Sequence, residues 1–87
     1  MRGTFGHTVR NDALEPLRCR LEPWGREFVI HPHAELFFRV SGNPEPRALK
    51  AHWSAQELIL YGPTGSDIQV FHGDREVASG YEAKPLG

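Results

Sequence analysis

The chain has 87 residues, and its ten Lys and Arg residues against eleven Asp and Glu residues give a net charge of -1 at pH 7. This length allows one small domain with a single core and excludes most large enzyme scaffolds. Because no run of like charges forms a basic face, we expect no nucleic-acid partner.

The termini and the distribution of apolar residues bear on location and domain boundaries. No apolar run approaches the roughly 18 residues of a membrane-spanning helix, and the N-terminal stretch lacks the apolar segment of a signal peptide. We therefore expect a cytoplasmic protein with no membrane partner. Residues 1–12 and 82–87 are predicted to be flexible terminal segments, flanking a single small β domain at residues 13–81.

Two-residue periodicity predicts strands in the first half of that domain. The odd-numbered positions of residues 17–21 are apolar, and charged residues lie between them. Over residues 28–40 the even-numbered positions are apolar, so this face is predicted to be buried, with Pro32 dividing the stretch into two strands. As the only cysteine, Cys19 cannot form an intrachain disulfide bond and is predicted to be a small buried thiol.

Residues 47–61 admit two interpretations. As a helix, they would place several alanines and Leu58 on one stripe and would end at Gly62. As strands, they would form two short strands joined by a turn at residues 54–56. We favour the strands because the neighbouring segments are strands and residues 58–61 are apolar all round.

Turn residues separate the remaining strands. The Gly73–Asp74 pair predicts a hairpin turn between strands at residues 67–71 and 75–78. The predicted fold class is therefore all-β, a small sandwich or barrel of six to seven short antiparallel strands. The alternative is an α+β fold with one helix in residues 47–61.

A group of histidines and a carboxylate suggests a metal site. His31, His33 and Glu35 are spaced so that their side chains emerge on one face of an extended strand. Two imidazoles and a carboxylate form the ligand set of a facial triad, and His72 could add a ligand from a neighbouring strand. This face lies opposite the apolar one, however, so we favour an ordinary polar outer face over a metal site.

The same stretch resembles the first motif of the cupin family. Gly25, His31–Pro32–His33, Glu35 and Gly42 follow that motif's order, with one residue between His33 and Glu35 where the family has three or four. The resemblance implies a β-barrel in which His31, His33, Glu35 and His72 bind a divalent transition metal such as Fe, Zn, Mn or Ni. It also implies a metalloprotein or metalloenzyme that acts on a small molecule.

Two phenylalanines are out of phase with the predicted core. Phe37 and Phe71 each lie on the polar face of their strand. Apolar residues at such positions indicate a surface that a second copy of the chain or a partner covers. Together with Arg39 they are our candidate interface or ligand-binding residues. The chain offers no convincing set of catalytic residues, so we favour a non-catalytic β domain that binds a protein or a ligand, is homo-oligomeric and needs no cofactor. The alternative function is the metal-binding one implied by the cupin resemblance.

Overall fold

Alternating apolar and polar residues form extended strands in the computed structural model, which describes residues 3–42, 49–63 and 65–86. No helix occurs in these residues. The strands are β1 (Gly3–Arg10), β2 (Leu17–Glu22), β3 (Arg26–Ile30), β4 (Glu35–Gly42), β5 (Lys50–Ser54), β6 (Glu57–Tyr61), β7 (Ser66–His72), β8 (Arg75–Glu76) and β9 (Glu82–Ala83). The all-β prediction is confirmed, and β3 and β4 are separated around Pro32 as expected.

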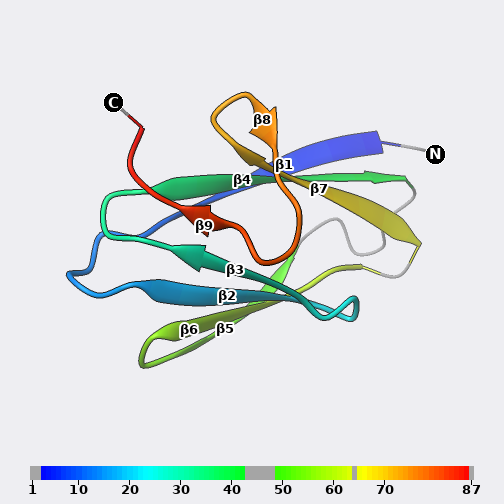
Figure 1. Ribbon diagram of the computed structural model, residues 1–87. Coiled ribbons are helices and arrows are strands. Elements are labelled where there is room, and N and C mark those ends of the chain that lie inside the picture. Colours follow the sequence, from blue (N-terminus) through cyan, green and yellow to red (C-terminus); the bar gives the residue numbers. More distant parts are fainter. Residues whose placement is uncertain (1–2, 43–48, 64, 87) are drawn as a thin grey trace.

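The strands form two sheets that face each other (Figure 1). Sheet A has the order β1-β4-β7-β8, and sheet B has the order β5-β6-β2-β3-β9. Neither sheet is closed into a barrel, so the sandwich form of the prediction is the correct one. The expectation that all strands are antiparallel is wrong for two pairs, because β2 runs parallel to β6 and β3 runs parallel to β9. These partners are joined by long connections, whereas a tight hairpin would force the antiparallel arrangement.

The core lies between the inner faces of the two sheets. In β4 the even-numbered residues are buried, as the sequence predicts, and Phe38 packs edge-on against Phe28 with ring centroids 6.2 Å apart. Cys19 is 1% exposed on β2. The buried apolar side chains are those of Val9, Leu17, Cys19, Leu21, Phe28, Ile30, Ala34, Leu36, Phe38, Val40, Leu58, Leu60, Ile68, Val70, Val77 and Ala83. One continuous core therefore holds both sheets together.

The segment with two interpretations forms a hairpin. β5 and β6 pair antiparallel on either side of a turn at residues 55–56. A helix in residues 47–61 is therefore wrong for residues 49–61, while positions 47 and 48 lie outside the described residues. The strand form prevails because β6 also pairs with β2, which satisfies its backbone groups while Leu58 and Leu60 enter the core.

Both terminal segments contribute strands, which corrects the predicted domain boundaries. β1 pairs with β4 over eight residues, although residues 1–12 were expected to be flexible. Near the other end, β9 adds Ala83 to the core, although residues 82–87 were expected to be a flexible tail. These segments carry little local apolar periodicity, and their order comes from pairing with distant strands. Residues 1, 2 and 87 lie outside the described residues.

The described part of the chain holds no helix with the length and hydropathy needed to cross a lipid bilayer.

The turn at Gly73–Asp74 joins β7 to β8, as the sequence predicts.

The neighbouring residues Phe37 and Phe38 test which face of β4 supports the fold. We expect Phe38→Ala to lower the free energy of unfolding by about 3–5 kcal/mol, because it leaves a cavity in the core. The matched change Phe37→Ala removes an aromatic contact on the outer face, and we expect a loss of about 0.5–1.5 kcal/mol. Urea unfolding followed by tryptophan fluorescence measures both. Equal losses would contradict the assignment of the two faces.

Candidate functional site

Two aromatic rings lie together on the outer face of sheet A. Phe37 of β4 is directly opposite Phe71 of β7, and their ring centroids are 6.5 Å apart. Both side chains point away from the core because each is flanked by buried residues, Leu36 and Phe38 or Val70 and His72. Phe37 is 39% exposed. The out-of-phase pair predicted from the sequence is thus brought into contact on the solvent side.

Arg39 completes this group, which we call the aromatic patch (Phe37, Phe71 and Arg39). Its guanidinium carbon lies 5.1 Å from the centre of the Phe71 ring. Nε of Arg39 donates to Oε1 of Gln69 at 3.0 Å, and Nε2 of Gln69 donates to Oε1 of Glu76 at 3.2 Å. These contacts hold the guanidinium beside the ring. Among the described residues its Nη1 has no hydrogen-bond partner, so it can donate to a ligand.

The exposed ring of Phe37 lies over β1. Gly6 is on the neighbouring strand, and a Cβ atom at this position would overlap the Phe37 ring. The absence of a side chain at Gly6 therefore leaves the space that the tip of the ring occupies. This contact gives Phe37 a fixed orientation although it faces solvent.

A hollow of about 360 Å³ lies at the end of the aromatic patch. Arg10 forms one wall, and it binds Asp12 at 2.8 Å and Glu35 at 3.5 Å. The lining residues are Arg10, His33, Ala34, Glu35, Phe37, Phe71, His72, Gly73 and Leu86. The hollow thus brings three of the predicted metal-site residues and two of the predicted interface residues into one region.

The predicted metal ligands nevertheless do not converge. Nε2 of His31 lies 2.9 Å from Oε1 of Glu82, which belongs to β9 in sheet B. His33 has a positive φ of 69°, so the chain between β3 and β4 is bent and the spacing no longer places three side chains on one face. In the described ranges, no three His, Cys, Asp or Glu side chains are grouped so that they could hold a metal ion. The barrel interior implied by the cupin resemblance is also not formed, because the sheets are open.

The fourth predicted ligand, His72, lies inside the sandwich. Its side chain is on the inner face of β7, the residue is 8% exposed, and Nδ1 is 2.7 Å from the hydroxyl of Tyr81. Its other ring nitrogen is buried and has no hydrogen-bond partner among the described residues. His72 therefore joins β7 to the segment that leads into β9.

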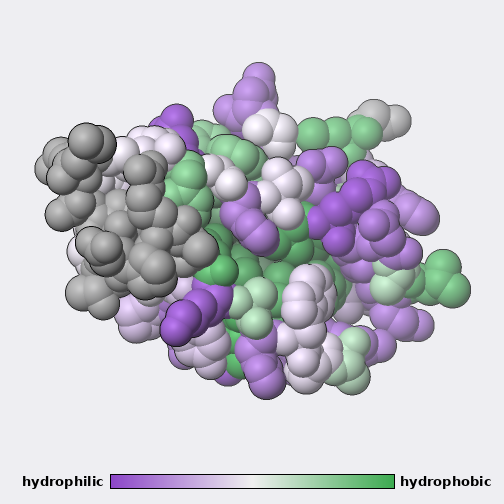
Figure 2. All heavy atoms as spheres, turned by 180° about the vertical axis from the view of Figure 1, so that it is seen from behind, coloured by the Kyte–Doolittle hydropathy of each residue, from purple (hydrophilic) through white to green (hydrophobic). Residues whose placement is uncertain are grey.

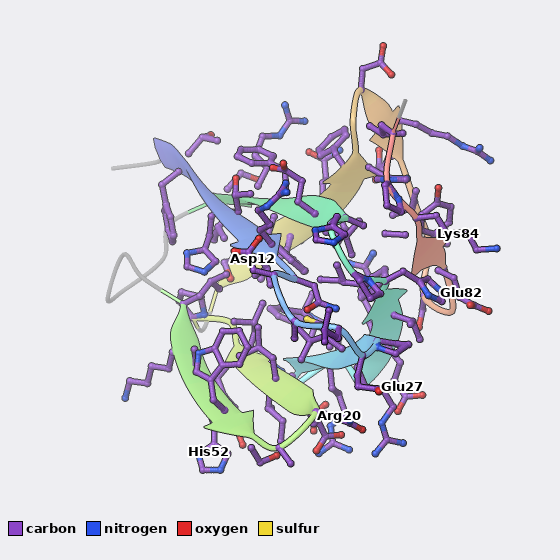
Figure 3. All side chains as sticks on the ribbon, turned by 90° about the vertical axis from the view of Figure 1, so that its left-hand side faces the viewer. Asp12, Arg20, Glu27, His52, Glu82 and Lys84 are labelled. Carbon is purple, nitrogen blue, oxygen red and sulfur yellow. The ribbon has the colours of Figure 1, made fainter. Side chains whose placement is uncertain are left out.

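A second, smaller hollow of about 190 Å³ lies on the outer face of sheet B. Arg20 of β2 and Glu27 of β3 are opposite one another there, and Figure 3 shows both side chains on the same outer surface. The charges in this hollow balance, since Arg18 and Glu57 are also opposite each other. The arrangement matches a solvated sheet face and was not singled out by the sequence.

Sequence reasoning missed Asn11, which positions one corner of the hollow beside the aromatic patch. Its Nδ2 donates to the backbone oxygens of Ile30 and Glu15, each at 2.8 Å, and its Oδ1 accepts the N–H of Ala13 at 2.9 Å. The backbone oxygen of Asn11 accepts the N–H of His33 at 2.7 Å. Asn11 is almost fully buried. The Asn–Asp pair at residues 11–12 is a turn signal that could have indicated this role.

Comparisons of the chain with protein families, with curated proteins and with solved structures gave no match.

The role of Asn11 can be tested by removing its amide. We expect Asn11→Ala to lower the free energy of unfolding by about 1–3 kcal/mol, because the backbone oxygens that it binds lose a buried donor. We also expect faster hydrogen exchange at the amide of Ala13, because its N–H donates to Oδ1 of Asn11. The surface variant Asp12→Ala serves as the control. Unchanged exchange at the Ala13 amide would show that the Asn11 side chain does not hold this corner.

Cys19 generates a prediction about pH. Burial raises the pKa of its thiol from 9.0 to about 12. The unfolded chain therefore loses this proton near pH 9, whereas the folded protein retains it. The contribution to stability is fully present below pH 9 and is lost as the pH rises towards 12.

We expect the free energy of unfolding to fall between pH 8 and pH 10.5 by more in the wild type than in Cys19→Ala, since lysine and tyrosine titration is common to both. In the wild type we also expect iodoacetamide to modify the thiol only after denaturation. Equal losses in the two proteins, or rapid modification of the folded protein, would contradict this account.

Proposed function

We propose that this domain is a non-catalytic binding module that recognises a protein partner through the aromatic patch of sheet A. The observation that carries the proposal is the contact between Phe37 and Phe71 on a face where charged and polar residues are the norm. Exposed aromatic residues and arginine are enriched at the centres of protein interfaces. The patch combines both, and its residues are held in place before binding.

The surroundings of the patch support a partner of a particular chemistry. The two rings offer an apolar centre, and at its edge Arg39 offers Nη1, which has no partner within the described ranges. The hollow beside Phe37 and Phe71 is large enough for one apolar side chain of the partner. A partner segment with an apolar or aromatic anchor and a neighbouring carboxylate would satisfy both features.

The contacts of the reactive side chains support binding over catalysis. Cys19 is buried and its pKa is raised, so it is not a nucleophile near neutral pH. The hydroxyl of Ser66 donates to the backbone oxygen of Pro63 at 2.6 Å, as expected for a turn. His72 binds Tyr81 inside the core. In the described part of the chain, none of these contacts favours the alternative metal-binding function.

The proposal also includes self-association, as the sequence suggested. A domain of this size buries a limited fraction of its surface, and a second copy would add to its stability.

The aromatic patch can be tested with a matched pair of variants. Phe71→Ser combined with Arg39→Glu removes the ring and reverses the charge. The control, Ile59→Ser combined with Arg18→Glu, removes an apolar side chain and reverses a charge on the outer face of sheet B. Immobilised wild type, patch variant and control variant would each be used to capture proteins from the cells that express the domain. Circular dichroism would confirm that all three are folded.

We expect a partner that binds the wild type and the sheet B control but loses affinity for the patch variant by about 30-fold or more in calorimetry, the loss typical of interface hot spots. A partner that binds the patch variant as tightly as the wild type, or that is lost with the sheet B control, would contradict the proposal.

A further inference from the structure

The two sheets end in edge strands of very different character. In the described part of the chain, sheet A ends in β1 and β8, and sheet B ends in β5 and β9. β8 and β9 have two residues each, and β5 is short and carries Lys50. Natural proteins blunt their edge strands in these ways, because a free row of backbone groups can pair with another chain.

β1 lacks these protections. It has eight residues, contains no proline, and has no lysine, arginine, aspartate or glutamate before Arg10. Its register with β4 is unbroken from Gly3 to Arg10. No described strand pairs with its outer edge. β1 is therefore a long, regular edge that is uncharged up to its last residue, Arg10.

The backbone groups that β1 presents at this edge can be identified. The N–H of Asn11 donates to the oxygen of Ala34, which continues the β1–β4 register by one pair. In an antiparallel ladder, hydrogen-bonded and non-hydrogen-bonded pairs alternate. Val9 and the other odd-numbered residues of β1 therefore bond to β4. The N–H and C=O groups of the even-numbered residues (Thr4, Gly6, Thr8 and Arg10) point to the free edge.

The same side of the sandwich has inner-face residues that are not covered. His7 is exposed although Phe38, opposite it on β4, is buried. Trp53 is likewise exposed although Leu58, opposite it on β6, is buried. Trp53 is 59% exposed. Figure 3 places β1 and β5 on the same side of the molecule, one in each sheet. Seen from that side in Figure 2, apolar surface lies between polar margins. The layer opposite β5 is therefore incomplete.

We propose that β1 pairs antiparallel with β1 of a second copy of this chain, about a two-fold axis at His7. In this register Thr4 pairs with Arg10 and Gly6 pairs with Thr8. All four residues whose backbone groups point to the free edge therefore exchange hydrogen bonds with the second copy. Phe5 of each copy lies opposite Val9 of the other on the core side. The two A sheets become one continuous sheet.

The edge fits a second copy for three reasons. A two-fold interface uses the same surface twice, and this register is self-complementary. With the two His7 side chains on the axis counted as neutral at pH 7, no like charges meet, because Arg10 pairs with a threonine. The surface area that a strand pair alone buries is small compared with the roughly 800 Å² that each partner buries in a stable interface. The added strand extends sheet A across the uncovered inner face of β5, where Trp53 and Ala51 supply further apolar area.

This inference specifies the self-association in the proposed function and does not involve the aromatic patch. A dimer joined at β1 would present two patches on one sheet face, since the outward residues of β4 and β7 stay exposed in both copies.

Cysteine crosslinking tests the register. In the proposed dimer His7 is opposite its own copy in a non-hydrogen-bonded pair, where Cα atoms are about 4.5 Å apart, a distance that a disulfide can span. We expect His7→Cys to form a covalent dimer on mild oxidation. The matched variant Thr8→Cys faces Gly6 of the partner, about 7–8 Å from its own counterpart, and should stay uncrosslinked. The buried Cys19 thiol does not compete. Failure of His7→Cys to crosslink, or equal crosslinking of both variants, would overturn the register.

Light scattering tests the edge itself. We expect the wild type to be dimeric at micromolar concentration, and Thr8→Pro to be monomeric because proline removes an N–H that points to the free edge and not to β4. Thr8→Ala is the control and should remain dimeric, with circular dichroism confirming the fold of each. If Thr8→Pro does not fold, Thr8→Lys places a charge at the same edge and should also dissociate the dimer.

A monomeric wild type would overturn the proposal. A dimer that survives in Thr8→Pro and Thr8→Lys but dissociates when Phe71→Ser and Arg39→Glu are combined would place self-association on the aromatic patch instead. Loss of partner capture with an intact β1 dimer would count against the patch alone, so the two proposals fail separately.

Discussion

The alternation of side chains along β4, one into the interior and the next out to solvent, is the constraint on which the rest of the structure depends. β4 pairs with β1 on one side and β7 on the other, so its phase determines which residues of all three strands are buried. A shift of one residue would exchange Phe38 for Phe37 in the core. The same phase that closes the core against Phe28 therefore also exposes Phe37 and Arg39 on the other face.

The outer face of sheet A is ordered by contacts that local sequence alone would not require. Phe37 lies over Gly6 from one neighbouring strand and against Phe71 from the other. Gln69 and Glu76 then hold Arg39 beside the second ring. Side chains that are fixed before binding lose less conformational entropy when a partner arrives. This physical property, more than the exposed apolar area, makes the patch suitable for recognition.

The two sides of the sandwich have different edge strands, so one side is closed and the other is open. On the side of β8 and β9 the edges are short, and Tyr81 with His72 closes the interior. On the side of β1 and β5 a long edge, charged only at its last residue, lies beside an uncovered tryptophan. The closed side stabilises the monomer, whereas the open side has hydrogen-bonding groups and apolar surface that a further strand can satisfy.

Sequence alone determined the features that depend on neighbouring residues. The two-residue periods of residues 17–21 and 28–40 identified the buried faces, the Gly73–Asp74 pair identified a hairpin, and Cys19 was recognised as a buried thiol. The sequence predicted that Phe37 and Phe71 lie on the outer faces of their strands, but it did not predict that their rings are in contact. Only the tertiary structure decided the strand β1, the parallel pairing of β2 with β6, and the separation of His31 from His33. The reason is physical. Periodicity is encoded within a strand, whereas pairing partners and the bend at His33 depend on hydrogen bonds to residues far away in the chain, such as the one to Asn11.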